Sequence, residues 1–116
     1  MRKDNAYLED ILDAARAIRR FTDGVSLEAY RANEEKYEAV NRKFEIIGEA
    51  ARRLSPEAKS LFPEIPWRLL TAMRNILIHD YDDVDLDVVW ETIQRDLLPL
   101  GARLEKHLAQ NPPPQS

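Results

Sequence analysis

Apolar residues recur at alternating intervals of three and four along two long stretches of the chain, and this feature constrains its fold most. The first stretch carries the pattern at Tyr7, Ile11, Ala14, Ile18 and Phe21, and the second at Tyr37, Val40, Phe44, Ile47, Ala51 and Leu54. Such spacing places the apolar side chains on one face of an α-helix. Long amphipathic helices joined by short connections predict an all-α fold, an up-and-down bundle of four to five helices.

Turn and cap residues divide the chain further. The sequence Thr22-Asp23-Gly24 ends the first long helix, and Ser26 is expected to cap a short helix that extends through Tyr30. Ser55 is expected to cap another short helix, which begins at Pro56.

The second half of the chain predicts two more long helices. One is expected from Trp67 to about Ile78, with Pro66 at its first position. The acidic stretch 80–87 offers several N-caps for the other, and Pro99 should kink that helix or end a segment of it. The apolar residues of this last helix are Leu86, Val89, Ile93, Leu97, Leu100 and Leu104.

Length and composition indicate one ordinary globular domain. We assign residues 1–110 of the 116 to this domain and 111–116 to a flexible tail. The absence of cysteine excludes disulfides, thiolate metal sites and cysteine nucleophiles, and it fits a cytoplasmic location. No stretch approaches the roughly 18 apolar residues that would span a membrane. The net charge of −4 argues against a general polyanion-coating role, so a nucleic-acid site would have to be local and built from a few arginines.

The segment from Arg74 to Tyr81 carries the most chemical information. On a helical wheel Leu69, Leu70, Met73, Ile76 and Leu77 share one sector, which is expected to be the core face. The opposite side holds Arg68, Thr71, Asn75, Ile78 and His79. Arg74 and Tyr81 lie together on the flank, and Asn75 is four residues before His79, so its amide can orient the imidazole. An outward Ile78 among polar neighbours suggests a surface that meets a partner, although a frayed helix end with solvated polar residues has the same pattern.

The order Arg74, Asn75, His79, Tyr81 resembles the motif of the HEPN-superfamily ribonucleases, and in particular of the HepT toxin family. In that motif an arginine and a histidine are four to six residues apart. The resemblance extends to further blocks, in order along the chain, at residues 7–11, 45–51, 63–67 and 84–92. The acidic Asp80 occupies the variable position between His79 and Tyr81.

The resemblance implies a metal-independent endoribonuclease that needs no cofactor, in which the RNA 2′-hydroxyl attacks the adjacent phosphate. His79 would transfer protons, because an imidazole titrates near neutral pH. Arg74 would stabilise the charge that develops on phosphorus. Asn75 would fix the imidazole or contact phosphate, and the substrate would be RNA, with tRNA as one candidate. A homodimer would place two such sets in one groove.

The resemblance also implies a protein partner. In the HepT family that this chain resembles, a nucleotidyltransferase antitoxin inactivates the toxin by transferring AMP to the tyrosine of the His-x-Tyr motif. The matching residue here is Tyr81. Phosphates added there would occupy the site beside Arg74 and repel RNA. A plain packing role for the Tyr81 ring remains the alternative.

Other residues leave alternatives open. Glu49 either pairs with Arg74 or His79 across the bundle, as a supporting site residue, or is a plain surface glutamate. Basic residues of the second long helix either extend an RNA-binding surface or are simply solvated: Arg42, Lys43, Arg52 and Arg53. His107 is expected at the surface. The acidic stretch lacks the glycine and glutamate of a calcium loop, so no metal site is expected.

The rival functional class is a catalytically silent HEPN module that binds a nucleotide or its nucleotidyltransferase partner. A third reading is a purely structural helical dimer, in which Arg74, His79 and Tyr81 would tolerate substitution.

Overall fold

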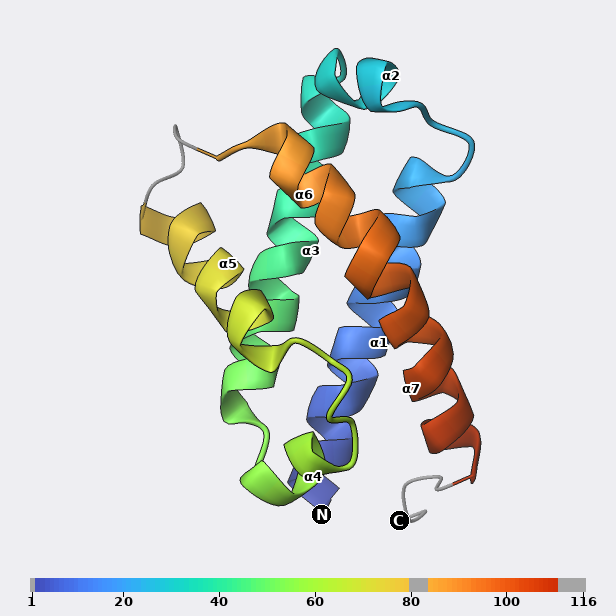
Figure 1. Cartoon of the computed structure of the whole chain (residues 1–116), viewed down its shortest axis with the longest axis vertical. Coiled ribbons are helices and arrows are strands. Elements are labelled where there is room, and N and C mark those ends of the chain that lie inside the picture. Colours follow the sequence, from blue (N-terminus) through green and yellow to red (C-terminus); the bar gives the residue numbers. More distant parts are fainter. Residues whose placement is uncertain (1, 80–83, 111–116) are drawn as a thin grey trace.

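The computed structural model describes residues 2–79 and 84–110, and the regular elements within these ranges are helical. Two long helices, α1 (Arg2–Thr22) and α3 (Glu34–Arg53), pack along each other and form the centre of the bundle (Figure 1). Helix α5 (Trp67–His79) packs on α3, and α7 (Leu98–Gln110) packs on α1. The predicted all-α bundle is therefore confirmed.

Side-chain caps fix the ends of several helices. The Ser26 hydroxyl accepts a hydrogen bond from Ala29 N–H at the start of α2 (Leu27–Arg31), and Ser55 does the same for Ala58 N–H at the start of α4 (Pro56–Ser60). Both caps were expected from the sequence. Helix α5 begins at Trp67, one residue after Pro66, whose carbonyl accepts the bond from Leu70 N–H.

The last long helix is interrupted near the proline, as predicted. Asp85 caps α6 (Leu86–Thr92), a π-helical turn η2 (Ile93–Leu97) follows, and α7 continues from it. At this turn Leu98 N–H bonds to the carbonyl of Ile93, five residues earlier. Pro99 has no N–H to donate, and in a regular α-helix its ring would clash with the carbonyl four residues before it. The wider π-helical turn accommodates the proline.

The apolar faces meet in one core. Its fully buried members include Leu8, Ile11 and Ile18 of α1, Phe44 and Ile47 of α3, and Ile93, Leu97, Leu100 and Leu104 of the last helix. Trp67 is buried at the start of α5, and Trp90 of α6 lies against Tyr30 with ring centroids 5.1 Å apart. Within the described residues, no helix is both long and apolar enough to cross a bilayer.

Candidate active site

Helix α5 presents the motif residues to the outside of the bundle. Leu70, Met73 and Leu77 are buried, whereas Asn75 and His79 are exposed, in agreement with the helical wheel. The wheel was wrong for Ile76, which is 46% exposed. The reason is that α5 lies at the edge of the bundle and packs mainly on α3 (Figure 1). The buried face of α5 is therefore narrower than the buried face of a helix at the centre of the bundle.

Gly48 lets α3 and α5 approach each other closely at Arg74. A Cβ atom built on Gly48 would lie 2.3 Å from the Arg74 Cβ and 2.8 Å from the Leu70 carbonyl oxygen. Real Cβ atoms do not come so near to such atoms, so only glycine fits at this position. The backbone of Arg74 is therefore held directly against α3.

Two side chains hold the Arg74 guanidinium. Its Nε lies 3.0 Å from Glu49 Oε2, and its Nη1 donates a hydrogen bond of 3.1 Å to Asn75 Oδ1. Of the alternatives for Glu49, the pairing with Arg74 is the one found. A guanidinium has five N–H groups, so three of them have no partner within the described residues.

Glu49 is shared by three arginines. Its Oε1 accepts from Arg52 Nη2 at 2.9 Å and from Arg53 Nε at 2.8 Å, while its Oε2 faces Arg74. Hydrogen bonds from Arg52 and Arg53 lower the pKa of Glu49 to about 2, with Arg74 as a further contributor. The carboxylate therefore stays ionised at any ordinary pH, and this cluster of four side chains carries a net charge of +2.

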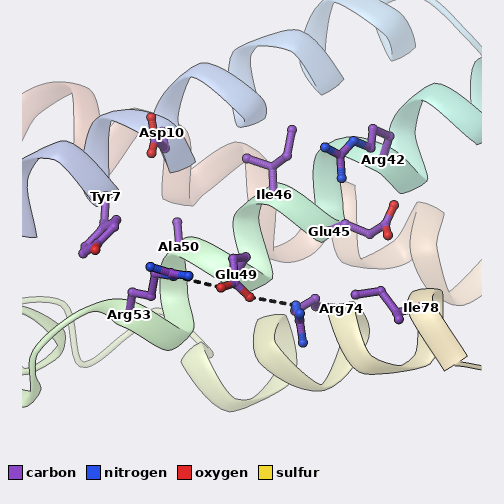
Figure 2. A pocket seen from close by; sticks show the side chains of 10 residues that line it. All are labelled: Tyr7, Asp10, Arg42, Glu45, Ile46, Glu49, Ala50, Arg53, Arg74 and Ile78. Atoms are coloured by element: carbon purple, nitrogen blue, oxygen red, sulfur yellow. Dashed lines mark hydrogen bonds and ion pairs between the residues drawn. The ribbon is translucent and has the colours of Figure 1, made fainter.

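Arg74 lies in a shallow groove of about 340 Å³ between α1, α3 and α5 (Figure 2). Ile78, which is 42% exposed, follows Arg74 along the same wall. Besides Glu49, the acidic side chains of Asp10 and Glu45 line the groove, so its charges are mixed. The groove is open and shallow, which fits a surface that a second molecule completes better than an enclosed pocket.

The structure brings Arg74, Asn75 and Glu49 together but does not join His79 to them. His79 is the exposed last residue of α5, five residues after Arg74, so the two side chains leave the helix about 140° apart. The bond that the Asn75 oxygen accepts comes from Arg74 instead of His79. Tyr81 and Asp80 lie outside the described residues.

One other expectation needs correction. His107 is not simply a surface residue, because its ring packs edge-on against Phe62 at 5.0 Å and burial lowers the pKa of the imidazole. The basic residues of α3 are divided among three grooves: Arg42 and Arg53 line the Arg74 groove, and Lys43 and Arg52 line two other grooves.

The role of Gly48 gives a stability prediction. Gly48→Ala should lower the free energy of unfolding by about 1–2 kcal/mol, because overpacking at Arg74 outweighs the roughly 1 kcal/mol that alanine gains over glycine inside a helix. Gly101→Ala is the matched control: a Cβ there would meet the Ala15 Cβ at an ordinary 3.9 Å, so this variant should be more stable than wild type. Denaturant unfolding of both variants measures the difference, and equal stabilisation by both would contradict the close approach.

Comparison with known proteins identifies the family. The family model described as "Ribonuclease HepT-like" matches residues 11–107. A protein of Thermococcus cleftensis named probable ribonuclease HepT is 41% identical over 105 residues, which cover 90% of this chain and 96% of that protein. Two proteins whose names describe candidate RNases are also similar. One, from Methanocaldococcus jannaschii, is 34% identical over 86% of this chain and 92% of its own length. The other, from Caldanaerobacter subterraneus, is 32% identical over 93% of this chain and 96% of its own length.

No solved structure shows significant similarity to the chain. The family match and these relatives nevertheless cover almost all of the helical bundle, including the segment with Arg74 and His79. The chain therefore belongs to the ribonuclease HepT-like family of the HEPN superfamily.

Proposed function

We propose that this chain is a metal-independent endoribonuclease that acts as the toxin of a toxin–antitoxin pair. The observation that carries the proposal is the fixed Arg74 guanidinium, held by Glu49 and Asn75, with three N–H groups that no other described residue uses. A planar guanidinium fits two phosphate oxygens at once. Membership of a ribonuclease family supports RNA as the source of that phosphate.

The reaction follows from the two side chains. The RNA 2′-oxygen forms a bond to phosphorus while the bond from phosphorus to the 5′-oxygen breaks. The proton of the 2′-hydroxyl is removed and another proton is delivered to the leaving 5′-oxygen, and His79 serves this transfer. Arg74 stabilises the negative charge that develops on the phosphoryl oxygens.

The placement of the two residues supports a homodimer as the working form. Arg74 and His79 of one chain point about 140° apart around α5 and lie about 7.5 Å apart along its axis. A two-fold axis beside α5 would bring His79 of the second copy toward Arg74 of the first. Ile78 supplies exposed apolar surface beside Arg74, where such a contact would form.

The dimer gives a direct prediction. Light scattering at micromolar concentration should give twice the mass of the chain, and Ile78→Glu should shift the protein toward the monomer because it places a charge in the interface. Val88→Glu is the control, since Val88 is 49% exposed but lies on α6, outside the Arg74 groove. A wild-type monomer under these conditions would contradict the proposal.

Substitution of the two catalytic residues tests the activity itself. His79→Ala should reduce RNA cleavage by about 10²–10⁴-fold, and Arg74→Ala by about 10²–10³-fold. Both side chains lie off the buried face of α5, and alanine retains the Arg74 Cβ, so neither variant should lose more than about 1 kcal/mol of stability.

The same variants should no longer slow growth when the protein is expressed without a partner. Arg19→Ala, which removes an exposed positive charge from α1, provides the control for the effect of losing one positive charge on growth. A folded His79→Ala or Arg74→Ala protein that stays fully toxic would show that the catalytic assignment is wrong. A wild type without cleavage would leave the catalytically silent HEPN module as the better interpretation.

We further propose that a nucleotidyltransferase antitoxin silences the enzyme by transferring AMP to Tyr81. The basis is the short distance in sequence: Tyr81 follows α5 by two residues, and the added phosphate would compete for the guanidinium that RNA phosphate uses. The acidic product would also repel RNA electrostatically.

Intact-mass analysis after co-expression with the nucleotidyltransferase tests this step. The wild type should gain AMP, and Tyr81→Phe should gain none, keep most of its cleavage activity and escape inactivation. The activity is retained because His79, not the phenol, transfers the protons. Tyr7→Phe is the control for a second phenol near Arg74. AMP adducts that persist in Tyr81→Phe would show that another residue accepts AMP. An unmodified wild type would mean that the nucleotidyltransferase inactivates the toxin by complex formation alone.

A further inference from the structure

A second groove, of about 730 Å³, is lined by residues of α3, α4 and α5 and of the segment between α4 and α5. All of its charged lining residues are cations, namely Arg52, Lys59 and Arg68. By contrast, the Arg74 groove has as many carboxylates as cations along its walls. A one-sign groove on a chain of net charge −4 indicates an anionic ligand.

The three cations come from different elements, and the structure holds them in place. The Trp67 indole Nε1 donates to the carbonyls of Phe62 and Lys59, at 3.2 and 3.3 Å, which fixes the end of α4 to the start of α5. Lys59 and Arg68 are thereby brought to one groove. Within the described residues neither of them forms an ion pair, whereas Arg52 shares Glu49 with two other arginines.

The start of α5 also favours an anion. The amino end of a helix carries partial positive charge, and acidic residues in the first turn usually offset it. The first turn of α5 has no acidic residue and instead carries Arg68, whose charge has the unfavourable sign for this position. A bound phosphate would compensate both the helix dipole and Arg68.

The groove leads to the catalytic residues. Arg68, Thr71 and Asn75 line it along one face of α5, and the same face continues to His79. The distance from Arg68 to His79 along the helix is about 16 Å, enough for about four or five nucleotides at the 3.4 Å rise of a stacked strand. Asn75 lines this groove, while its hydrogen-bond partner Arg74 lines the other one.

We infer that this groove, with Lys59 and Arg68 at its outer end and Asn75 at its inner end, binds the phosphates of the RNA strand that flanks the bond to be cleaved. The inference rests on the proposed ribonuclease function and names where its substrate lies. A strand fits better than a single phosphate, because the three cations come from three different helices and the groove has about twice the volume of the Arg74 groove. The positive groove provides affinity and register, while Arg74 and His79 provide the chemistry.

The test measures binding of a short single-stranded 2′-O-methyl RNA, which the enzyme cannot cleave because the attacking hydroxyl is blocked. The full-length protein is titrated by fluorescence anisotropy over a range of salt concentrations. Each lost phosphate contact reduces the slope of log K against log salt by about 0.7 for a single strand. Lys59→Gln/Arg68→Gln should therefore flatten the slope by about 1.4 and weaken binding roughly 25-fold at about 0.1 M salt.

The matched control is Arg19→Gln/Lys106→Gln, which removes two exposed positive charges from α1 and α7, away from the groove. This control should bind nearly as wild type. Because Lys59 is half-buried, Arg68→Gln alone serves as a second variant, with an expected slope change of about 0.7. Thermal unfolding of all variants verifies that they are folded.

Three outcomes would overturn the inference: equal losses in the groove and control variants, no loss in either, or no RNA binding by the wild type. Equal losses would mean that RNA binds through the net charge of the protein alone. No loss in either variant would mean that the groove does not bind RNA and would favour an acidic protein surface as its ligand. A parallel assay with unmodified RNA separates this inference from the proposed function. Groove-dependent binding without cleavage would contradict the ribonuclease activity alone, whereas cleavage with an unchanged KM in Lys59→Gln/Arg68→Gln would contradict the groove alone.

Discussion

The contact between Gly48 of α3 and Arg74 of α5 is the constraint on which the rest of the site depends. The missing side chain at Gly48 brings the backbone of Arg74 against α3, and the next residue, Glu49, then meets the guanidinium at 3.0 Å. A larger residue at position 48 would push α5 outward and carry Arg74 away from its carboxylate. A glycine inside a helix normally lowers the stability of the fold. Here it permits the close contact of the two helices that fixes the position of the Arg74 guanidinium.

Local charge, not net charge, makes this acidic chain suited to RNA. Three arginines share Glu49, so the cluster keeps two positive charges while one carboxylate holds it in a defined geometry. The neighbouring groove adds Lys59 and Arg68 and has no carboxylate among its lining residues. Asn75 connects the two regions through its hydrogen bond with Arg74. Positive charge is thus gathered where α3, α4 and α5 meet, around Glu49 and in the neighbouring groove, although the chain as a whole has a net charge of −4.

Most of the fold could be predicted from the sequence, because apolar spacing and caps act locally. The caps at Ser26 and Ser55 and the interruption before Pro99 follow from single residues and their neighbours. Features that depend on the distance between helices could not be predicted. The tight fit at Gly48 appears only once α3 and α5 are packed, although a glycine in mid-helix beside Glu49 is a signal that could have pointed to it. The exposure of Ile76 likewise depends on α5 lying at the edge of the bundle.

The central claim is that Arg74 and His79 cleave RNA by attack of the 2′-hydroxyl, without a metal ion. The most direct test is the mass of the RNA ends after cleavage by the wild-type protein in the presence of a chelator. We expect undiminished cleavage with 2′,3′-cyclic phosphate on one product and a 5′-hydroxyl on the other, because the 2′-oxygen becomes bonded to phosphorus as the 5′-oxygen leaves. Products with a 3′-hydroxyl and a 5′-phosphate, or cleavage that the chelator abolishes, would contradict it.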